Sequence, residues 1–120
     1  MNELELTGRA RTHVIELIEP ACVLHYETVA AFLAMRDAAA SEGIDVQARS
    51  SFRDFATQMS IWNRKWRGER RILDRQGRAL ERAQLTDAEC VDAILCWSAI
   101  PGGSRHHWGS DIDVIDAVAI

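Results

Sequence analysis

The sequence lacks the features that mark several specialised classes of protein. It has only three cysteines in 120 residues and no Cys-x-x-Cys pair, so we expect reduced thiols at Cys22, Cys90 and Cys96 rather than a disulfide. No apolar run approaches the roughly 18 residues that a membrane-spanning helix needs. The net charge of −4 provides no general attraction to nucleic acid or to a membrane surface, and we expect neither as a partner.

The N-terminal residues also lack the pattern of a secretory signal peptide. Met1–Leu6 is acidic, whereas a signal peptide begins basic and then becomes apolar. We therefore expect a cytoplasmic protein from the sequence as printed. An export signal outside it would instead place the protein in the periplasm.

The composition that is present is typical of a folded globular domain. Hydrophobic residues make up 48% and charged residues 27% of the chain. A length of 120 residues is enough for one domain, so we expect residues 1–120 to belong to a single domain.

The spacing of apolar residues predicts an α+β fold, with N-terminal helices packed on a small antiparallel sheet. Period-2 alternation predicts strands at Ile44–Phe52 and near Asp111–Ile115, and we expect both in one sheet. Helical spacing or a capping box predicts helices in four segments: Glu5–Ile18, His25–Glu42, Asp54–Trp66 and the segment that begins with Thr86–Glu89.

Positive charge is concentrated in Arg64–Arg82, which holds eight of the fourteen basic residues. Few apolar residues interrupt the segment, and Gly77 indicates a turn, so we expect a solvated loop or hairpin. A nucleic-acid surface is the alternative, but the segment offers no aromatic stacking residue beyond Trp66. We therefore favour the solvated hairpin.

The densest group of chemically active side chains lies in Ser104–Val114. This stretch contains a histidine pair, a glycine and two aspartates. Imidazole nitrogen and carboxylate oxygen are ligands that zinc accepts. Alternation after Gly109 predicts that Asp111 and Asp113 share one face of a strand. The segment is therefore a candidate metal site.

The spacing of Ser104, His106, Gly109 and Asp113 fits Ser-x-His-x-x-Gly-x-x-x-Asp. This motif resembles that of the zinc D-Ala-D-Ala carboxypeptidase family, the VanY-like metallopeptidases of the Hedgehog/DD-peptidase fold. The resemblance implies a Zn2+ cofactor with His106 and Asp113 as ligands. His107 and Asp111 are then either partners that orient a ligand or alternative ligands themselves.

A second part of the resemblance precedes the helix expected at Asp54–Trp66. Arg53 follows an aromatic residue, and Gln58 comes five residues later, as in the carboxypeptidase branch of the family. The resemblance implies that Arg53 lies in the substrate cleft with Gln58 and Ser104 as polar contacts. A guanidinium matches the C-terminal carboxylate of a peptide with two parallel hydrogen bonds. The alternative is a structural Arg53 that pairs with Asp54 at the helix start.

The printed sequence ends at Ile120, seven residues after Asp113, and the resemblance implies further groups in a later segment. In the family, a catalytic glutamate and a third ligand histidine come from that segment, so we expect the glutamate beyond Ile120. Residues 1–120 would then be the N-terminal part of a metallopeptidase domain, with no catalytic residue of their own. Alone they would be inactive and would expose a sheet edge that favours self-association.

These observations predict a zinc-dependent D-alanyl-D-alanine carboxypeptidase-type peptidase that acts on peptidoglycan peptides. The expected partner is a peptide with a free C-terminal carboxylate. The alternative is a non-catalytic metal- or peptide-binding module of the same fold.

Overall fold

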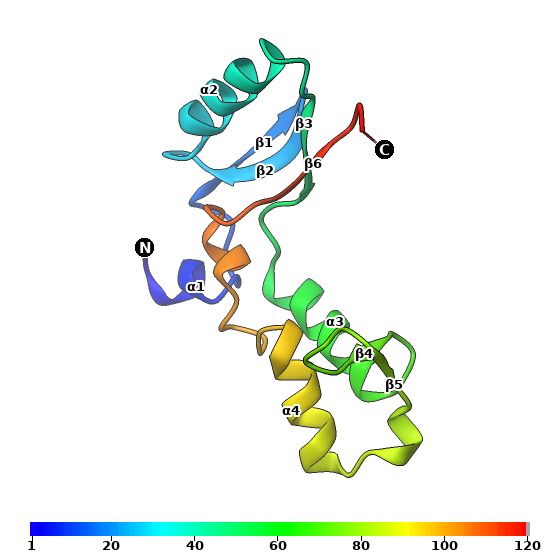
Figure 1. Ribbon diagram of the computed structural model, residues 1–120. Coiled ribbons are helices and arrows are strands. Elements are labelled where there is room, and N and C mark those ends of the chain that lie inside the picture. Colours follow the sequence, from blue (N-terminus) through cyan, green and yellow to red (C-terminus); the bar gives the residue numbers. More distant parts are fainter. Residues whose placement is uncertain (120) are drawn as a thin grey trace.

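Helices and antiparallel strand pairs share the chain, which confirms the predicted α+β class. The computed structural model describes residues 1–119 and measures 48 × 37 × 19 Å, with two lobes joined by a waist (Figure 1). No helix in these residues is long and apolar enough to span a membrane. The sheet lobe contains β1 (Val14–Ile18), β2 (Ala21–His25), α2 (Val29–Ala40), β3 (Val46–Ser50) and β6 (Asp113–Asp116).

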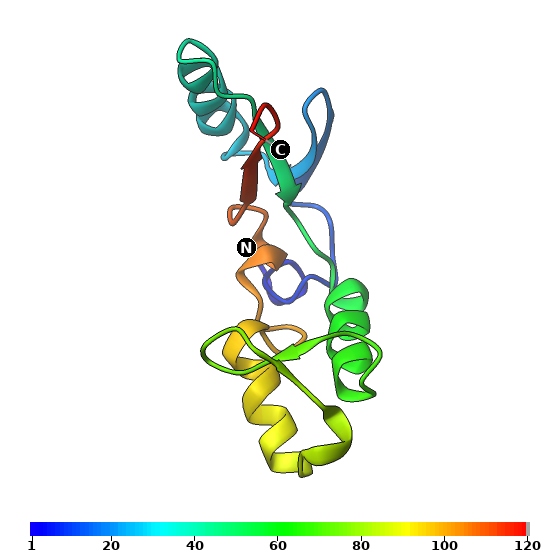
Figure 2. The same ribbon diagram turned by 45° about the vertical axis from the view of Figure 1, so that its right-hand side comes forward.

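The helical lobe and the waist contain the remaining elements. Figure 2 shows two links between the lobes, with the N-terminal segment lying between them. One link leads from β3 into α3, and the other leads from α4 through η2 into β6. The elements are α1 (Glu3–Leu6), α3 (Phe55–Trp66), β4 (Ile72–Leu73), β5 (Ala79–Leu80), η1 (Arg82–Gln84), α4 (Asp87–Trp97) and η2 (Arg105–Trp108).

The structure does not test the catalytic segment that we expect after Ile120. Ile120 lies outside the described residues. The catalytic glutamate that we expect beyond Ile120 lies outside them too, as does the third ligand histidine. The later catalytic segment therefore stays a prediction.

The N-terminal helix predicted at Glu5–Ile18 is wrong. A short α1 is followed by β1, which pairs antiparallel with β2 from Val14↔His25 to Ile18↔Ala21. β1 is rich in β-branched residues, and Pro20 follows it in the turn, so strand pairing prevails over the helical spacing. The pairing of β2 also delays the next helix, and α2 begins at Val29 rather than His25.

The predicted pairing of the strand after Gly43 with the strand after Gly109 is confirmed. β3 and β6 are antiparallel neighbours, and an irregularity between Ala48 and Ser50 places Ser50 opposite Asp113. The core beneath the strands is formed by Cys22, Leu24, Phe32 and Val46. β3 is the only partner strand of β6 within residues 1–119, so self-association through its other edge stays a prediction.

The basic segment forms the hairpin that the sequence predicts. β4 and β5 pair around Gly77, and Ile72 packs with Cys90 and Ile94 of α4 in a second core. The guanidinium of Arg82 lies 4.5 Å from the centre of the Trp66 ring and is therefore part of this lobe's structure.

Two helix starts are fixed by the residues that the sequence offers. Asp54 accepts a hydrogen bond from the Thr57 N–H and caps α3. The predicted capping box is present at α4, where Thr86 and Glu89 exchange hydrogen bonds. The cap at Asp54 sets the point where the chain leaves the waist, directly after Arg53.

Candidate metal site and substrate cleft

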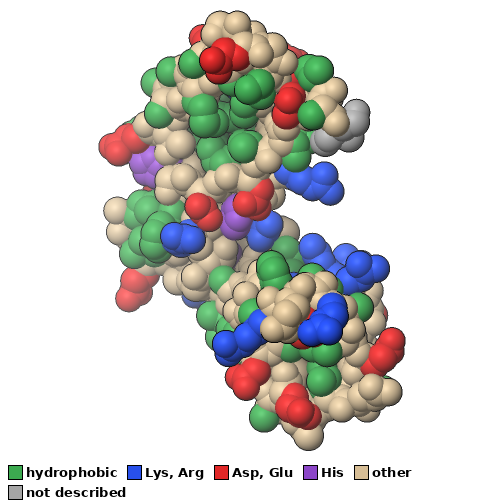
Figure 3. All heavy atoms as spheres, in the orientation of Figure 1, with side chains coloured by type: hydrophobic (Ala, Val, Ile, Leu, Met, Phe, Trp, Pro, Cys, Tyr) green, Lys and Arg blue, Asp and Glu red, His purple; other side chains and the backbone are tan. Residues whose placement is uncertain are grey.

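A polar cleft of about 360 Å³ lies at the waist. Figure 3 shows histidine, acidic and basic side chains gathering there on one face of the molecule. Its walls come from the β3–α3 link, α3, the end of α4, η2 and the start of β6. The motif segment and the upstream Arg53 segment therefore meet in one cavity, although they lie far apart in the sequence.

His106 is held with one ring nitrogen directed at the two aspartates. Its Nδ1 lies 2.9 Å from the carbonyl oxygen of Ser51, so Nδ1–H donates there and Nε2 keeps its lone pair. Nε2 lies 3.4 Å from Asp113 Oδ2 and 3.9 Å from Asp111 Oδ2. A backbone carbonyl that fixes the tautomer in this way is a common feature of metal-binding histidines.

The two aspartates near His106 lie in different secondary structure, one in a strand and one in the loop before it. Asp113 opens β6, whereas Asp111 precedes it, so the prediction that both share one strand face is wrong. β3 ends at Ser50, which lies opposite Asp113, so Asp111 has no strand partner in β3 and lies in the loop before β6. Asp113 also accepts a hydrogen bond from the Ser50 hydroxyl.

The spacing of these groups fits a metal ion in part. Two ligands bound to one zinc ion at tetrahedral geometry lie about 3.3 Å apart. The separation of 3.4 Å between His106 and Asp113 agrees with this value, and Asp111 at 3.9 Å lies close by. No group of three His, Cys, Asp or Glu side chains within residues 1–119 is arranged to hold a metal. The described chain thus offers a two-residue partial site.

His107 lies on the opposite side of the same turn and is completely buried. Its Nδ1–H donates to the carbonyl of Arg53 at 2.7 Å, and its Nε2 accepts the N–H of Gly102 at 3.1 Å. Both ring nitrogens are therefore occupied by backbone. The structure brings Asp111 to His106 and not to His107.

Arg53 is positioned by both histidines. Its backbone N–H donates to the carbonyl of His106 at 3.1 Å, while its own carbonyl accepts from the His107 ring. The side chain extends into the cleft, 3.3 Å from Gln58 Oε1 and 3.9 Å from Asp113 Oδ2. The guanidinium thus stands beside the candidate metal ligands, and the pairing with Asp54 is absent among the ion pairs of residues 1–119.

The two other predicted substrate contacts line the cleft but already have partners. Gln58 is 1% exposed, and its amide also donates to the carbonyl of Ala99 at 2.9 Å. Ser104 is 4% exposed and accepts the N–H of His106 at 3.1 Å. Gln58 therefore positions Arg53, and Ser104 fixes the start of η2.

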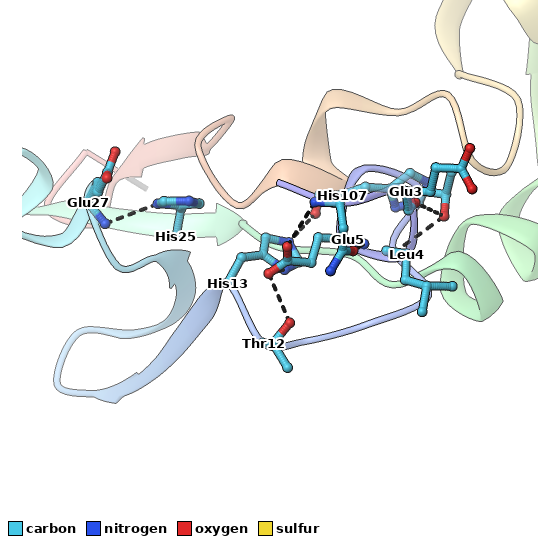
Figure 4. A network of polar contacts seen from close by, with 10 residues as sticks. Glu3, Leu4, Glu5, Thr12, His13, His25, Glu27 and His107 are labelled. Carbon is cyan, nitrogen blue, oxygen red and sulfur yellow. Dashed lines mark hydrogen bonds and ion pairs between the residues drawn. The ribbon is translucent and has the colours of Figure 1, made fainter.

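His13 is a buried residue that the sequence analysis did not place at the site. Its Nε2 lies 2.7 Å from the carbonyl of His107, and its Nδ1 lies 3.7 Å from a Glu5 carboxylate oxygen (Figure 4). His25 is separate and accepts the N–H of Glu27. The N-terminal segment therefore supports the turn that carries His107, a role that only the tertiary structure reveals.

The cleft also contains residues that the sequence does not single out as candidates for the site. Gln58, Ile61 and Lys65 have the spacing i, i+3 and i+7, which places them on one face of α3. That spacing was available in the sequence, but nothing in it showed that this face borders the site. The additional lining residues are Ile61, Lys65, Arg70, Trp97, Ser98, Ala99 and Arg105.

Two solved structures have a similar fold. A variant of vancomycin-resistance D,D-pentapeptidase VanY from the VanB-type cassette, in complex with Zn(II), matches with a TM-score of 0.67 at 19% identity. VanYB in complex with D-Alanine-D-Alanine also matches with a TM-score of 0.67, at 20% identity. They confirm the predicted fold. The matches cover 90% and 88% of this chain but only 56% and 51% of those proteins, so the chain spans about half their length.

Sequence comparison gives a closer relationship. An uncharacterized protein of Haemophilus influenzae is 43% identical over 98 residues, which cover 79% of this chain and 67% of that protein. The family model "VanY: D-alanyl-D-alanine carboxypeptidase" matches residues 21–119, which include both the Arg53 segment and the histidine–aspartate motif. The chain belongs to the VanY D-alanyl-D-alanine carboxypeptidase family.

Proposed function

We propose that this chain forms part of a zinc-dependent D-alanyl-D-alanine carboxypeptidase that acts on peptidoglycan peptides. The supporting observation is the placement of Arg53 in one cleft with His106 and Asp113. A group suited to a carboxylate thereby stands beside two groups suited to zinc. Membership of the VanY family supports the same assignment.

His106 and Asp113 are the proposed zinc ligands from this chain. The Ser51 carbonyl keeps the proton of His106 on Nδ1, so Nε2 can bind a metal. When bound, zinc would polarise the scissile carbonyl and lower the pKa of a bound water. We infer that the third ligand and the general base come from outside residues 1–120.

Arg53 is the proposed binding group for the terminal carboxylate of the substrate. Its backbone is fixed by hydrogen bonds to His106 and His107, and its guanidinium contacts the buried Gln58. The group is therefore held before substrate arrives, which reduces the conformational entropy lost on binding. Since only a free C-terminus offers a carboxylate there, the proposal implies selectivity for free acids over amides.

The test measures how fast the natural full-length protein cleaves two D-Ala-D-Ala peptides, one with a free C-terminal acid and one with an amidated C-terminus. Arg53→Lys keeps the charge but loses the planar two-donor geometry. We expect it to lower kcat/KM for the free acid by about 30-fold or more, equivalent to at least 2 kcal/mol, with a much smaller effect on the amide. Arg49→Lys is the matched control, because Arg49 is exposed on β3 and does not line the cleft.

The outcome also separates the enzyme from the alternative, a non-catalytic module that binds metal or peptide. If Arg53→Lys lowers the turnover of the free acid and of the amide equally, Arg53 does not bind the terminal carboxylate. Peptide binding without any turnover would favour the binding module. If the protein neither cleaves nor binds the free acid, the proposal is rejected.

A further inference from the structure

The pairing of β3 with β6 contains an irregularity directly beside the candidate metal site. Ala48 lies opposite Val114, and the next paired residue of β3 is Ser50, which lies opposite Asp113. Between these two pairs, β3 therefore contains one residue more than β6, and that residue is Arg49. Extra residues of this kind are common beside active sites, where they redirect a side chain.

The irregularity decides which side chain of β3 meets Asp113. In a regular pairing, Arg49 would lie opposite Asp113, and its guanidinium would compete with a metal ion for the carboxylate oxygens. With the extra residue in place, Arg49 is exposed, and the hydroxyl of Ser50 donates a hydrogen bond to Asp113 Oδ2. A neutral donor thus takes the position that a cation would have in the regular strand pair.

This hydrogen bond holds a carboxylate that is otherwise open to solvent. The Asp113 side chain is 61% exposed, and the oxygen that accepts from Ser50 is also the one 3.4 Å from His106 Nε2. A carboxylate oxygen has two lone pairs, so Oδ2 can accept from Ser50 and still bind a metal ion. The bond restricts rotation of the side chain and keeps Oδ2 beside Nε2 before any metal arrives, which reduces the entropy lost on binding.

Asp111 has no comparable support. Among the hydrogen bonds of residues 1–119, none involves its carboxylate, and its Oδ2 lies 3.9 Å from His106 Nε2. The residue after Ser50 serves the other candidate ligand, because the Ser51 carbonyl accepts from the Nδ1–H of His106 at 2.9 Å. The end of β3 and the residue after it therefore fix His106 and Asp113 and leave Asp111 free to rotate.

We propose that Ser50 is a positioning residue for the metal site, and that the irregularity in β3 makes Asp113 rather than Asp111 the carboxylate that binds zinc. The inference rests on the proposed function, because it takes Asp113 as a ligand. Ser50 acts through Asp113 and does not line the substrate cleft. Groups that hydrogen-bond to a ligating side chain in this way typically contribute about 10- to 100-fold to metal affinity.

The test measures the zinc affinity of the natural full-length protein by chelator competition, which needs no turnover. Ser50→Ala should weaken zinc binding by about tenfold, because Asp113 loses the bond that orients it. Ser50→Thr keeps a hydroxyl and should retain the affinity within about twofold. Unchanged affinity in Ser50→Ala, or an equal loss in both variants, would overturn the inference.

Ser51→Ala is the matched control, because the Ser51 hydroxyl accepts the N–H of Val23 in β2 at 3.0 Å and does not contact either candidate ligand. We expect zinc affinity to stay within about twofold, since the carbonyl that holds His106 remains. The melting temperature of the metal-free protein should fall by a few degrees, because a partly buried N–H loses its partner. Ser50→Ala should show the opposite pattern. If both variants lose zinc affinity in proportion to melting temperature, Ser50 is structural and the inference is overturned.

Two further variants show through which aspartate Ser50 acts. Ser50→Ala should have no additional effect on zinc affinity in Asp113→Ala, where the acceptor is gone, and should keep its effect of about tenfold in Asp111→Ala. Zinc binding that depends on Asp113 but not on Ser50 would overturn the inference and keep the proposed ligand. If the protein binds no zinc, or binds it equally well without Asp113, the proposed ligand and the inference fail together.

Discussion

Two consecutive histidines belong to different regions of this molecule. His106 faces the cleft with its Nε2 close to two aspartates, and its side chain is 12% exposed. His107 faces the interior, is fully buried, and uses both ring nitrogens on backbone groups. The difference shows that the partners of an imidazole, rather than its presence in a motif, decide whether it can bind a metal.

The comparison also explains why the two regions are coupled. The N–H of Arg53 donates to the carbonyl of His106, and the carbonyl of Arg53 accepts from the ring of His107. The buried side of the turn thus sets the backbone position of the cleft arginine. We expect damage on the buried side to reduce stability, and damage on the cleft side to reduce binding while the fold persists.

His107→Ala should have the largest effect and would break the buried region. The variant leaves a cavity and removes the partners of Arg53 carbonyl and Gly102 N–H, so we expect a loss of about 3–4 kcal/mol in the free energy of unfolding. His106→Ala is the matched control, and we expect it to cost about 1 kcal/mol or less. Urea denaturation of both variants measures the difference. Equal losses would contradict the division into two regions.

Gly8→Ala should disrupt the same buried region from the N-terminal side. Gly8 has φ +74°, and an added Cβ would overlap the His107 ring. Strain at positive φ and overpacking together predict a loss of about 3 kcal/mol. Gly43→Ala separates the two causes, because Gly43 has φ +80° with no atom near the added Cβ, and should cost about 1 kcal/mol. Similar losses in both variants would show that contact with His107 contributes nothing.

The sequence predicted the cleft side of this comparison better than the buried side. Local signals identified the helix start at Asp54, the capping box at Thr86 and the pairing of β3 with β6, because these depend on nearby residues or on simple alternation. The β1–β2 hairpin was missed, since its residues also satisfy helical spacing and only pairing across Pro20 decides between them. The burial of His13 depends on contacts with residues 94 positions away, which no local pattern encodes.

The cleft side can be tested through zinc affinity, which a chelator competition measures without any need for turnover. We expect Asp113→Asn to weaken zinc binding by about 100-fold, because a neutral amide is a poorer ligand than a carboxylate. Asp111→Asn should weaken it by about tenfold, since Asp111 lies farther from His106 and would act by charge or by orientation. A larger loss of zinc affinity in Asp111→Asn than in Asp113→Asn would make Asp111 the ligand instead of Asp113.

The smallest expected effect concerns Asp54, which joins the two regions at the start of α3. Hydrogen bonds from the hydroxyl and the backbone N–H of Thr57 lower the pKa of Asp54, assisted by Arg11. A carboxyl whose pKa is lower in the folded state adds stability that is present above its unfolded pKa. That contribution is lost as the pH falls through the folded pKa. Asp54 should therefore lose its stabilising effect only below about pH 4, where carboxyl groups of its kind begin to protonate.

Asp54→Asn isolates this charge, because asparagine caps a helix about as well as aspartate. At pH 7 we expect the variant to be less stable by about 0.5 kcal/mol, since the capping oxygen remains and the contact with Arg11 is exposed. As the pH falls from about 4 toward 2.5, the stabilities of the two proteins should converge, because protonation removes the charge from Asp54 as well. Denaturation curves over this range measure the convergence. A constant difference would show that the hydrogen-bonded cap, rather than its charge, anchors α3 beside Arg53.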